Sequence, residues 1–92
     1  MANVTNGDII EFNGKVCQAE IQGREGTYIH KEGFAINVAR GNEGYLTDLK
    51  TGYNFRAKWS DDTKILVKAE DVRHFQSAIY ELKKNYKGVD SE

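Results

Sequence analysis

The sequence contains a single cysteine, Cys17, and no proline. Because a disulfide needs two thiols and a cysteine-based zinc site needs several, Cys17 can complete neither within one chain. The cysteine content therefore fits a reducing compartment.

Long hydrophobic runs are also missing. None approaches the roughly 20 apolar residues that a membrane-spanning helix needs. The first residues, MANVTNGDII, have neither the basic start nor the apolar core of a signal peptide. We therefore expect a cytoplasmic protein, in a bacterium or an infected host cell, that does not bind a membrane.

The chain has no excess of charge of either sign. The chain has 13 Lys and Arg residues and 14 Asp and Glu residues, and the net charge at pH 7 is -1. This balance excludes the global electrostatic attraction by which nucleic-acid coats and membrane-surface proteins bind. Any charged contact surface must be a local patch that the fold creates.

The length of the chain limits its organisation. Ninety-two residues are enough for one domain, residues 1–92, and too few for two. A hydrophobic fraction of 39% with 29% charged residues is ordinary for a folded protein. We expect one thin hydrophobic core.

The strongest local signal is Asn13-Gly14, which lies between two segments rich in apolar residues. These two residue types readily adopt the positive φ angles of a two-residue hairpin turn. A turn at this point places Ile10 opposite Cys17. The inward face of the hairpin then comprises Ile10, Cys17, Ala19 and Ile21.

Glycine-containing turns continue along the chain and separate short segments that alternate between apolar and polar residues. In one of them Phe34, Ile36 and Val38 alternate, and we expect all three to point inward. The segments predicted as strands after the first hairpin are 27–30, 34–38, 45–49, 53–59 and 64–68.

The apolar period changes after Asp71. Apolar residues then recur at spacings of three and four, which is the pattern of an amphipathic helix that packs on the sheet. Glu70 and Asp71 stand where the helix dipole favours anions, and Gly88 is a natural stop. The predicted seam consists of Val72, Phe75, Ile79, Leu82 and Tyr86.

Together these elements predict a mainly β (α+β) fold. We expect a small, strongly curved antiparallel sheet, or a partly open SH3-like or OB-like barrel of about six strands, between about residues 8 and 68. One C-terminal amphipathic helix, at about residues 70–87, covers an open side.

Residues suited to catalysis or metal binding do not form a recognisable set. His30 and His74 lie on different predicted elements and have no ligand partner at a suitable spacing, so surface or partly buried positions are favoured. Cys17 is expected to be inert core packing, and Asp61-Asp62 is typical of a turn. We therefore expect no catalytic residue, cofactor or metal, and no enzyme activity, unless a homo-oligomer assembles a site from several chains.

The segment 53–59 interleaves aromatic and basic residues. Its alternation places Tyr53, Phe55, Ala57 and Trp59 on one face. That face is either buried in the core or exposed as a stacking platform of the kind that binds single-stranded nucleic acids. Burial is favoured, because a chain with one tryptophan and a thin core needs these side chains inside.

The other face of this segment suggests a binding surface. If 64–68 pairs antiparallel with 53–59 through an odd-length loop, Ile65 and Val67 join the aromatic face. The outer face is then cationic around one leucine, and it is either a contact surface for an anionic partner or a solvated sheet face protected by lysine. The predicted binding residues are Arg56, Lys58, Lys64, Lys68 and Leu66.

Two glycine pairs, Gly23/Gly26 and Gly41/Gly44, have a spacing that also occurs in phosphate-binding loops. Such loops need an adjacent helix, whereas strands are predicted on both sides here. They are interpreted as turn glycines whose loops could form a rim for a partner.

These observations favour a non-catalytic binding module, of the kind found among small cytosolic or phage-encoded regulators and inhibitors, that binds a protein partner. The alternative is a small β-barrel that binds single-stranded nucleic acid or a nucleotide, with Tyr45, Tyr53 or Trp59 as stacking groups. No motif in the sequence identifies the partner.

Overall fold

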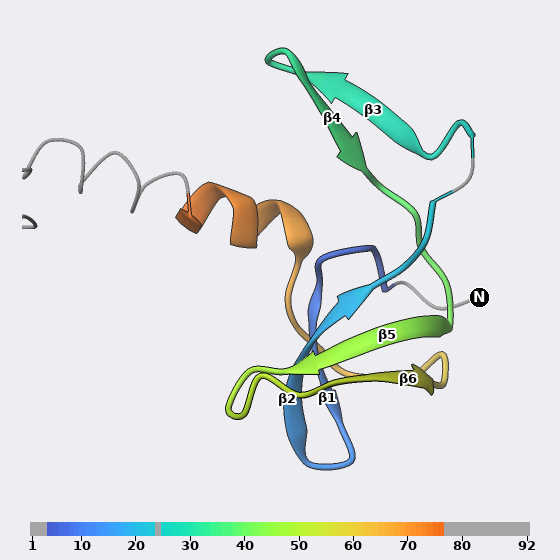
Figure 1. Cartoon of the computed structure of the whole chain (residues 1–92), viewed down its shortest axis with the longest axis vertical. Coiled ribbons are helices and arrows are strands. Elements are labelled where there is room, and N and C mark those ends of the chain that lie inside the picture. The colour runs from blue at the N-terminus through green and yellow to red at the C-terminus, as the bar shows by residue number, and fades with distance from the viewer. Residues whose placement is uncertain (1–3, 24, 77–92) are drawn as a thin grey trace, which may run out of the picture.

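The computed structural model describes residues 4–23 and 25–76 (Figure 1). A helix begins at residue 69 and is described as far as residue 76. The strands are β1 (Ile9–Phe12), β2 (Lys15–Glu20), β3 (Tyr28–Lys31), β4 (Phe34–Asn37), β5 (Glu43–Asp48), β6 (Asn54–Lys58) and β7 (Ile65–Val67).

Five strands form one antiparallel sheet in the order β6-β5-β2-β1-β7, and β3 and β4 form a separate two-stranded sheet. The predicted mainly β fold is confirmed, in its open form, since β6 and β7 are the two end strands of the larger sheet. The helix begins one residue before its predicted start. Its predicted continuation to residue 87 lies outside the described residues.

The first hairpin is confirmed in detail. Asn13 and Gly14 have φ angles of 50° and 79°, and Ile10 lies opposite Cys17. Local turn chemistry therefore sets the register of β1 against β2. The four residues predicted for its inward face, Ile10, Cys17, Ala19 and Ile21, are all buried.

The core continues through β5 and β6. Leu46 is fully buried between Ala19 of β2 and Phe55 of β6, which lie opposite it on either side. Trp59 is buried as well, and its indole Nε1 donates a hydrogen bond to the backbone oxygen of Gly41 (2.9 Å). The predicted burial of the aromatic face of residues 53–59 is thus confirmed at Trp59, whereas Tyr53, just before β6, is 66% exposed.

Strand β7 pairs with β1, and the predicted pairing of 64–68 with 53–59 is wrong. Ile65 lies opposite Ile10, and the Glu11 N–H donates to the backbone oxygen of Lys64 (3.0 Å). The first hairpin leaves one edge of β1 open, and this pairing provides hydrogen-bond partners for the backbone groups at that edge. It also packs Ile65 against the core. Val67, which was expected inside, is 37% exposed.

Strands β3 and β4 form a hairpin that extends away from the five-stranded sheet (Figure 1). We call this hairpin, residues 28–37, the arm. Its turn residues Glu32 and Gly33 have φ angles of 52° and 83°. The prediction that Phe34 points into the core is wrong, since Phe34 is 70% exposed. The alternation of the arm is real, but its apolar face lies away from the main core.

The base of the arm is fixed by hydrogen bonds. The Asn37 side chain donates from Nδ2 to the backbone oxygen of Ile21 (3.0 Å) and accepts at Oδ1 from the Ala39 N–H (2.9 Å). The Val38 N–H donates to the backbone oxygen of Thr27 (2.7 Å). These bonds set the position of the arm relative to the buried residues Ile21 and Ala39.

The start of the helix lies beside the sheet, with Ala69 buried and Val72 half-buried. Phe75, predicted as part of the buried seam, is instead 65% exposed. The remaining seam residues, Ile79, Leu82 and Tyr86, lie outside the described residues.

Candidate binding groove

The predicted cationic patch is not assembled as a single hairpin face. Arg56 and Lys58 belong to β6, whereas Lys64, Leu66 and Lys68 belong to β7 and its flanks, at the other end of the strand order. The binding role predicted for these five residues therefore loses the strand pairing on which it was based.

Two of the predicted cations have acidic partners within the chain. The Arg56 guanidinium lies 2.7 Å from Glu43 Oε2, a contact that lowers the pKa of Glu43 and raises the pKa of Arg56. Arg56 also lies over the Tyr45 ring, 5.7 Å from its centroid. Lys68 forms an ion pair with Asp8, with Nζ 2.7 Å from Oδ2. These contacts give both residues structural roles.

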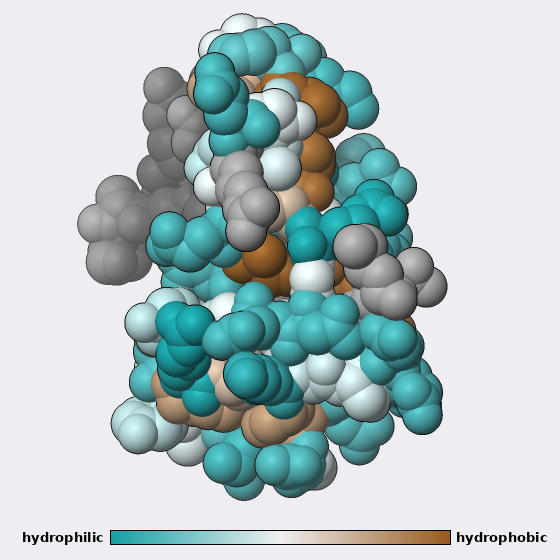
Figure 2. Space-filling view, turned by 90° about the vertical axis from the view of Figure 1, so that its right-hand side faces the viewer, coloured by the Kyte–Doolittle hydropathy of each residue, from teal (hydrophilic) through white to brown (hydrophobic). Residues whose placement is uncertain are grey.

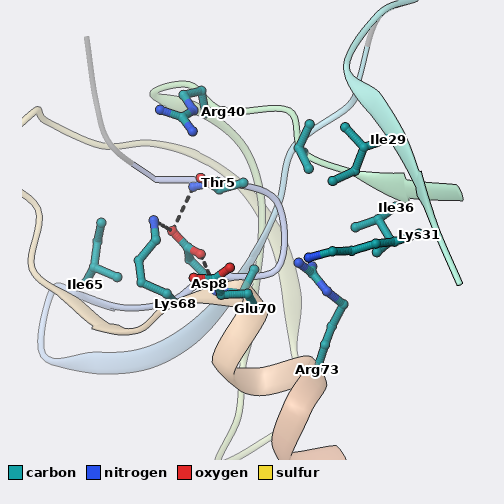
Figure 3. Close-up of a pocket in the computed structure, with 12 residues that line it drawn as sticks. Thr5, Asp8, Ile29, Lys31, Ile36, Arg40, Ile65, Lys68, Glu70 and Arg73 are labelled. Carbon is teal, nitrogen blue, oxygen red and sulfur yellow. Dashed lines mark hydrogen bonds and ion pairs between the residues drawn. The ribbon is translucent and has the colours of Figure 1, made fainter. Parts of the chain in front are cut away.

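A groove separates the arm from the start of the helix. Three adjoining hollows share the side chains of Ile36 and Arg73, and the largest has a volume of about 560 Å³. We call them together the arm–helix groove, and Figure 3 shows the largest of them. The groove is lined by Ile29, Lys31, Phe34 and Ile36 of the arm and by Glu70 and Arg73 of the helix.

The strand register explains which side of the arm faces the groove. Ile29 pairs with Ile36, and Lys31 pairs with Phe34. Because directly opposite residues in an antiparallel pair point to the same side, these four side chains share one face. The arm thus presents an apolar surface that carries one cation.

The floor of the largest hollow is held in place by a buried carboxylate. Asp8 is fully buried and accepts hydrogen bonds from the Thr5 N–H (2.8 Å), the Ala69 N–H (2.6 Å) and Lys68 Nζ (2.7 Å). Figure 3 shows this cluster beside Ile65, to the left of the arm. Asp8 therefore joins the N-terminal turn to the first helical residues.

Basic side chains outnumber acidic ones around the largest hollow. Lys31, Arg40, Lys68 and Arg73 line it, against Asp8 and Glu70. In residues 4–23 and 25–76, no acidic side chain forms an ion pair with Lys31, Arg40 or Arg73. The groove combines an apolar wall with cations that lack a partner in the described chain, which suits an anionic ligand with an apolar portion.

Residues with catalytic potential lie apart from the groove or are dispersed. The Cys17 side chain, on β2, is buried in the core, and this burial raises the pKa of its thiol. His30 and His74 are both exposed, on β3 and on the helix. Within the described ranges, no group of three or more His, Cys, Asp or Glu side chains is placed to hold a metal ion.

The glycine pairs contribute to structure. Gly44 lies inside β5, where a Cβ atom would collide with the backbone oxygen of Glu20. The carbonyl of Gly41 accepts the indole hydrogen bond of Trp59. The interpretation of Gly44 as a turn residue is therefore wrong, since it allows β5 to lie close to the end of β2.

Sequence reasoning missed most of the groove. Of the five predicted binding residues, only Lys68 lines it. The alternation in 27–38 could have indicated part of it, because Ile29, Lys31, Phe34 and Ile36 share one face if Glu32-Gly33 is taken as a two-residue turn. It did not indicate that this face lies opposite the helix.

No helix in the described part of the chain is long and apolar enough to cross a membrane. No protein-family model matches the chain, and searches of characterised proteins and of solved structures likewise find no match.

Proposed function

We propose that this chain is a non-catalytic binding module, such as a small cytosolic or phage-encoded regulator or inhibitor. It binds a protein partner through the arm–helix groove. The observation that supports this proposal is the exposed apolar face of the arm beside Lys31 and Arg73, which form no ion pair within residues 4–23 and 25–76.

Exposure of the arm is the first argument. Phe34 is 70% exposed and Ile29 44% exposed, although both lie on the face that lines the groove. Figure 2 shows apolar surface in the upper part of the molecule, at the height of the arm, next to hydrophilic side chains. Contiguous apolar surface of this kind is typical of interaction sites.

The construction of the arm is the second argument. An isolated two-stranded hairpin gains little stability of its own, and an exposed apolar face costs free energy. A partner that covers Phe34 and Ile29 would recover about 25 cal/mol for each Å² of apolar surface removed from water. A rigid base with an exposed apolar tip suits contact with another protein.

Capture from a bacterial lysate, followed by identification of the retained proteins, tests this proposal with two matched variants. Ile29→Asp places a charge on the groove face of the arm. Val16→Asp is the control, because Val16 is also a β-branched strand residue and is 46% exposed against 44% for Ile29. We expect a protein retained by the wild type and by Val16→Asp and lost with Ile29→Asp. Equal retention by all three, or no stoichiometric protein with any, contradicts the proposal.

A second candidate function, binding of single-stranded nucleic acid or a nucleotide, is favoured by one observation. Tyr53 is exposed and stacks on Phe55 (ring centroids 5.7 Å apart), and Lys15 lies 5.4 Å from the Phe55 centroid. Aromatic and basic groups combine in this way on stacking platforms. Trp59 is buried and cannot serve as a stacking group.

Titration of the chain with a thymidine oligonucleotide at low and high salt tests this alternative. Binding that weakens with salt and with Tyr53→Ala, but not with Tyr28→Ala on the arm, supports it. Absence of binding at low salt refutes it.

A further inference from the structure

We propose that Lys31 and Arg73 together form a subsite of the arm–helix groove that holds a carboxylate of an acidic, aliphatic segment of the partner protein. The inference rests on the proposed function and specifies the chemistry of that partner.

The two side chains come from different elements and converge. Lys31 ends β3, and Arg73 lies in the second turn of the helix. Figure 3 shows their cationic ends pointing to the same place, and both residues line the same two adjoining hollows. Two like charges brought together repel one another, and an oxyanion between them replaces this repulsion by two attractions.

Three other cations have a partner within the part of the chain that the structure describes. Arg56 pairs with Glu43, Lys68 pairs with Asp8, and Lys15 lies over the Phe55 ring. Across the described ranges, neither Lys31 nor Arg73 forms an ion pair. The fold therefore leaves these two charges available at one place, beside apolar side chains.

In residues 4–23 and 25–76, no acidic group around the groove forms an ion pair with Lys31 or Arg73. Asp8 is buried and engaged with Thr5, Lys68 and Ala69. The other titratable or charged side chains that line the two hollows are Arg40, Lys68 and Glu70 in the larger one and Glu32, Glu70, Asp71 and His74 in the other. Glu70 and Asp71 lie in the first helical turn, where the helix dipole already favours a negative charge.

The neighbours of the pair indicate which anion fits. Ile29 and Ile36 lie beside Lys31 on the same face of the arm, and Ile65 and Val38 line the same hollow. An aliphatic wall next to two cations suits a carboxylate flanked by aliphatic side chains. A nucleic acid would instead need aromatic surfaces for its bases, and the largest hollow has none.

The test uses the full chain, labelled with ¹⁵N, and a synthetic peptide that contains glutamate and leucine. The same peptide with glutamine in place of glutamate, and a thymidine oligonucleotide, are the comparison probes. The variant Lys31→Gln/Arg73→Gln removes the pair, and Arg56→Gln/Lys58→Gln removes the same charge from the exposed side of β6.

We expect the acidic peptide to shift the amide signals of residues around Lys31 and Arg73. Loss of two charge-assisted hydrogen bonds should weaken its binding by at least about tenfold in Lys31→Gln/Arg73→Gln. The control variant should stay within about twofold, as expected for charges outside the contact. The glutamine peptide should bind as weakly to the wild type as the acidic peptide binds to Lys31→Gln/Arg73→Gln.

Three results would overturn the inference: equal weakening by both double variants, equal binding of both peptides, or binding of the oligonucleotide at this site in preference to the acidic peptide. The carboxylate subsite and the proposed function can fail independently of one another. A partner that is lost with Ile29→Asp but retained by Lys31→Gln/Arg73→Gln would leave the groove as the contact surface and refute only the carboxylate subsite.

Discussion

Replacement of Asp8 is the most direct test of what holds the floor of the groove. The Asp8 carboxylate is buried and joins three parts of the chain, through Thr5, Lys68 and Ala69. Asp8→Ala leaves two backbone N–H groups without their acceptor and Lys68 without its counter-charge.

Each of the two backbone N–H groups that loses its acceptor costs about 1–3 kcal/mol, or about 2–6 kcal/mol together, and the loss of the counter-charge of the 44% exposed Lys68 adds little. Domains of this size have a total free energy of unfolding of about 5–14 kcal/mol, at about 0.05–0.15 kcal/mol per residue. Asp8→Ala should therefore remove a large share of the stability. Because about 1 kcal/mol corresponds to about 4–8 °C in Tm for such a domain, the Tm should fall by more than about 8 °C.

Urea unfolding followed by the fluorescence of Trp59, the single tryptophan and a buried one, measures this loss. Asp62→Ala is the matched control, because it removes the same group from an exposed position, and we expect a loss of less than about 0.5 kcal/mol. If Asp8→Ala costs no more than Asp62→Ala, the hydrogen bonds of Asp8 do not stabilise the fold and the reasoning is refuted.

Two further predictions concern the core. Leu46→Ala, at a fully buried site, should lower the free energy of unfolding in urea by about 2–5 kcal/mol. Phe75→Ala should lower it by less than about 1 kcal/mol, because Phe75 is exposed. Equal losses would show that Phe75 packs against the core. Burial raises the pKa of the Cys17 thiol, so folding should lose stability as the pH rises above about 8.5, where the unfolded thiol ionises. Comparison of urea unfolding for the wild type and Cys17→Ala between pH 7 and pH 10 isolates this contribution, and identical pH profiles would contradict it.

Local signals predicted the parts of the fold that short segments determine. The two residues of the Asn13-Gly14 turn set the register that buries Ile10 and Cys17. The change in apolar period near Asp71 located the start of the helix to within one residue. In both cases the information lies within a few consecutive residues.

Pairing between distant segments was not predictable in the same way. The alternation in 64–68 shows which side chains share a face, but it does not show whether the strand returns to β6 or crosses to β1. Hydrogen bonding of the open edge of β1 decides this, and that edge is defined only once the first hairpin has formed.

The candidate site depends on the same kind of information. The face shared by Ile29 and Ile36 follows from the arm's turn, whereas the direction of that face depends on the hydrogen bonds of Asn37 at the base. Lys31 and Arg73 are far apart in the sequence, and no periodicity links them. Their convergence is a property of the tertiary structure alone.

The way the arm joins the sheet has a consequence for variation among related chains. The larger sheet is complete without the arm, because Glu20 at the end of β2 lies opposite Tyr45 of β5. The two ends of the arm meet at the hydrogen bond between Val38 and Thr27. An insert with adjacent ends can change length at little entropic cost, about 0.6 kcal/mol for each doubling of a flexible loop. Residues 28–37 can therefore be exchanged for another hairpin, so that one scaffold could acquire new partners while its core stays unchanged.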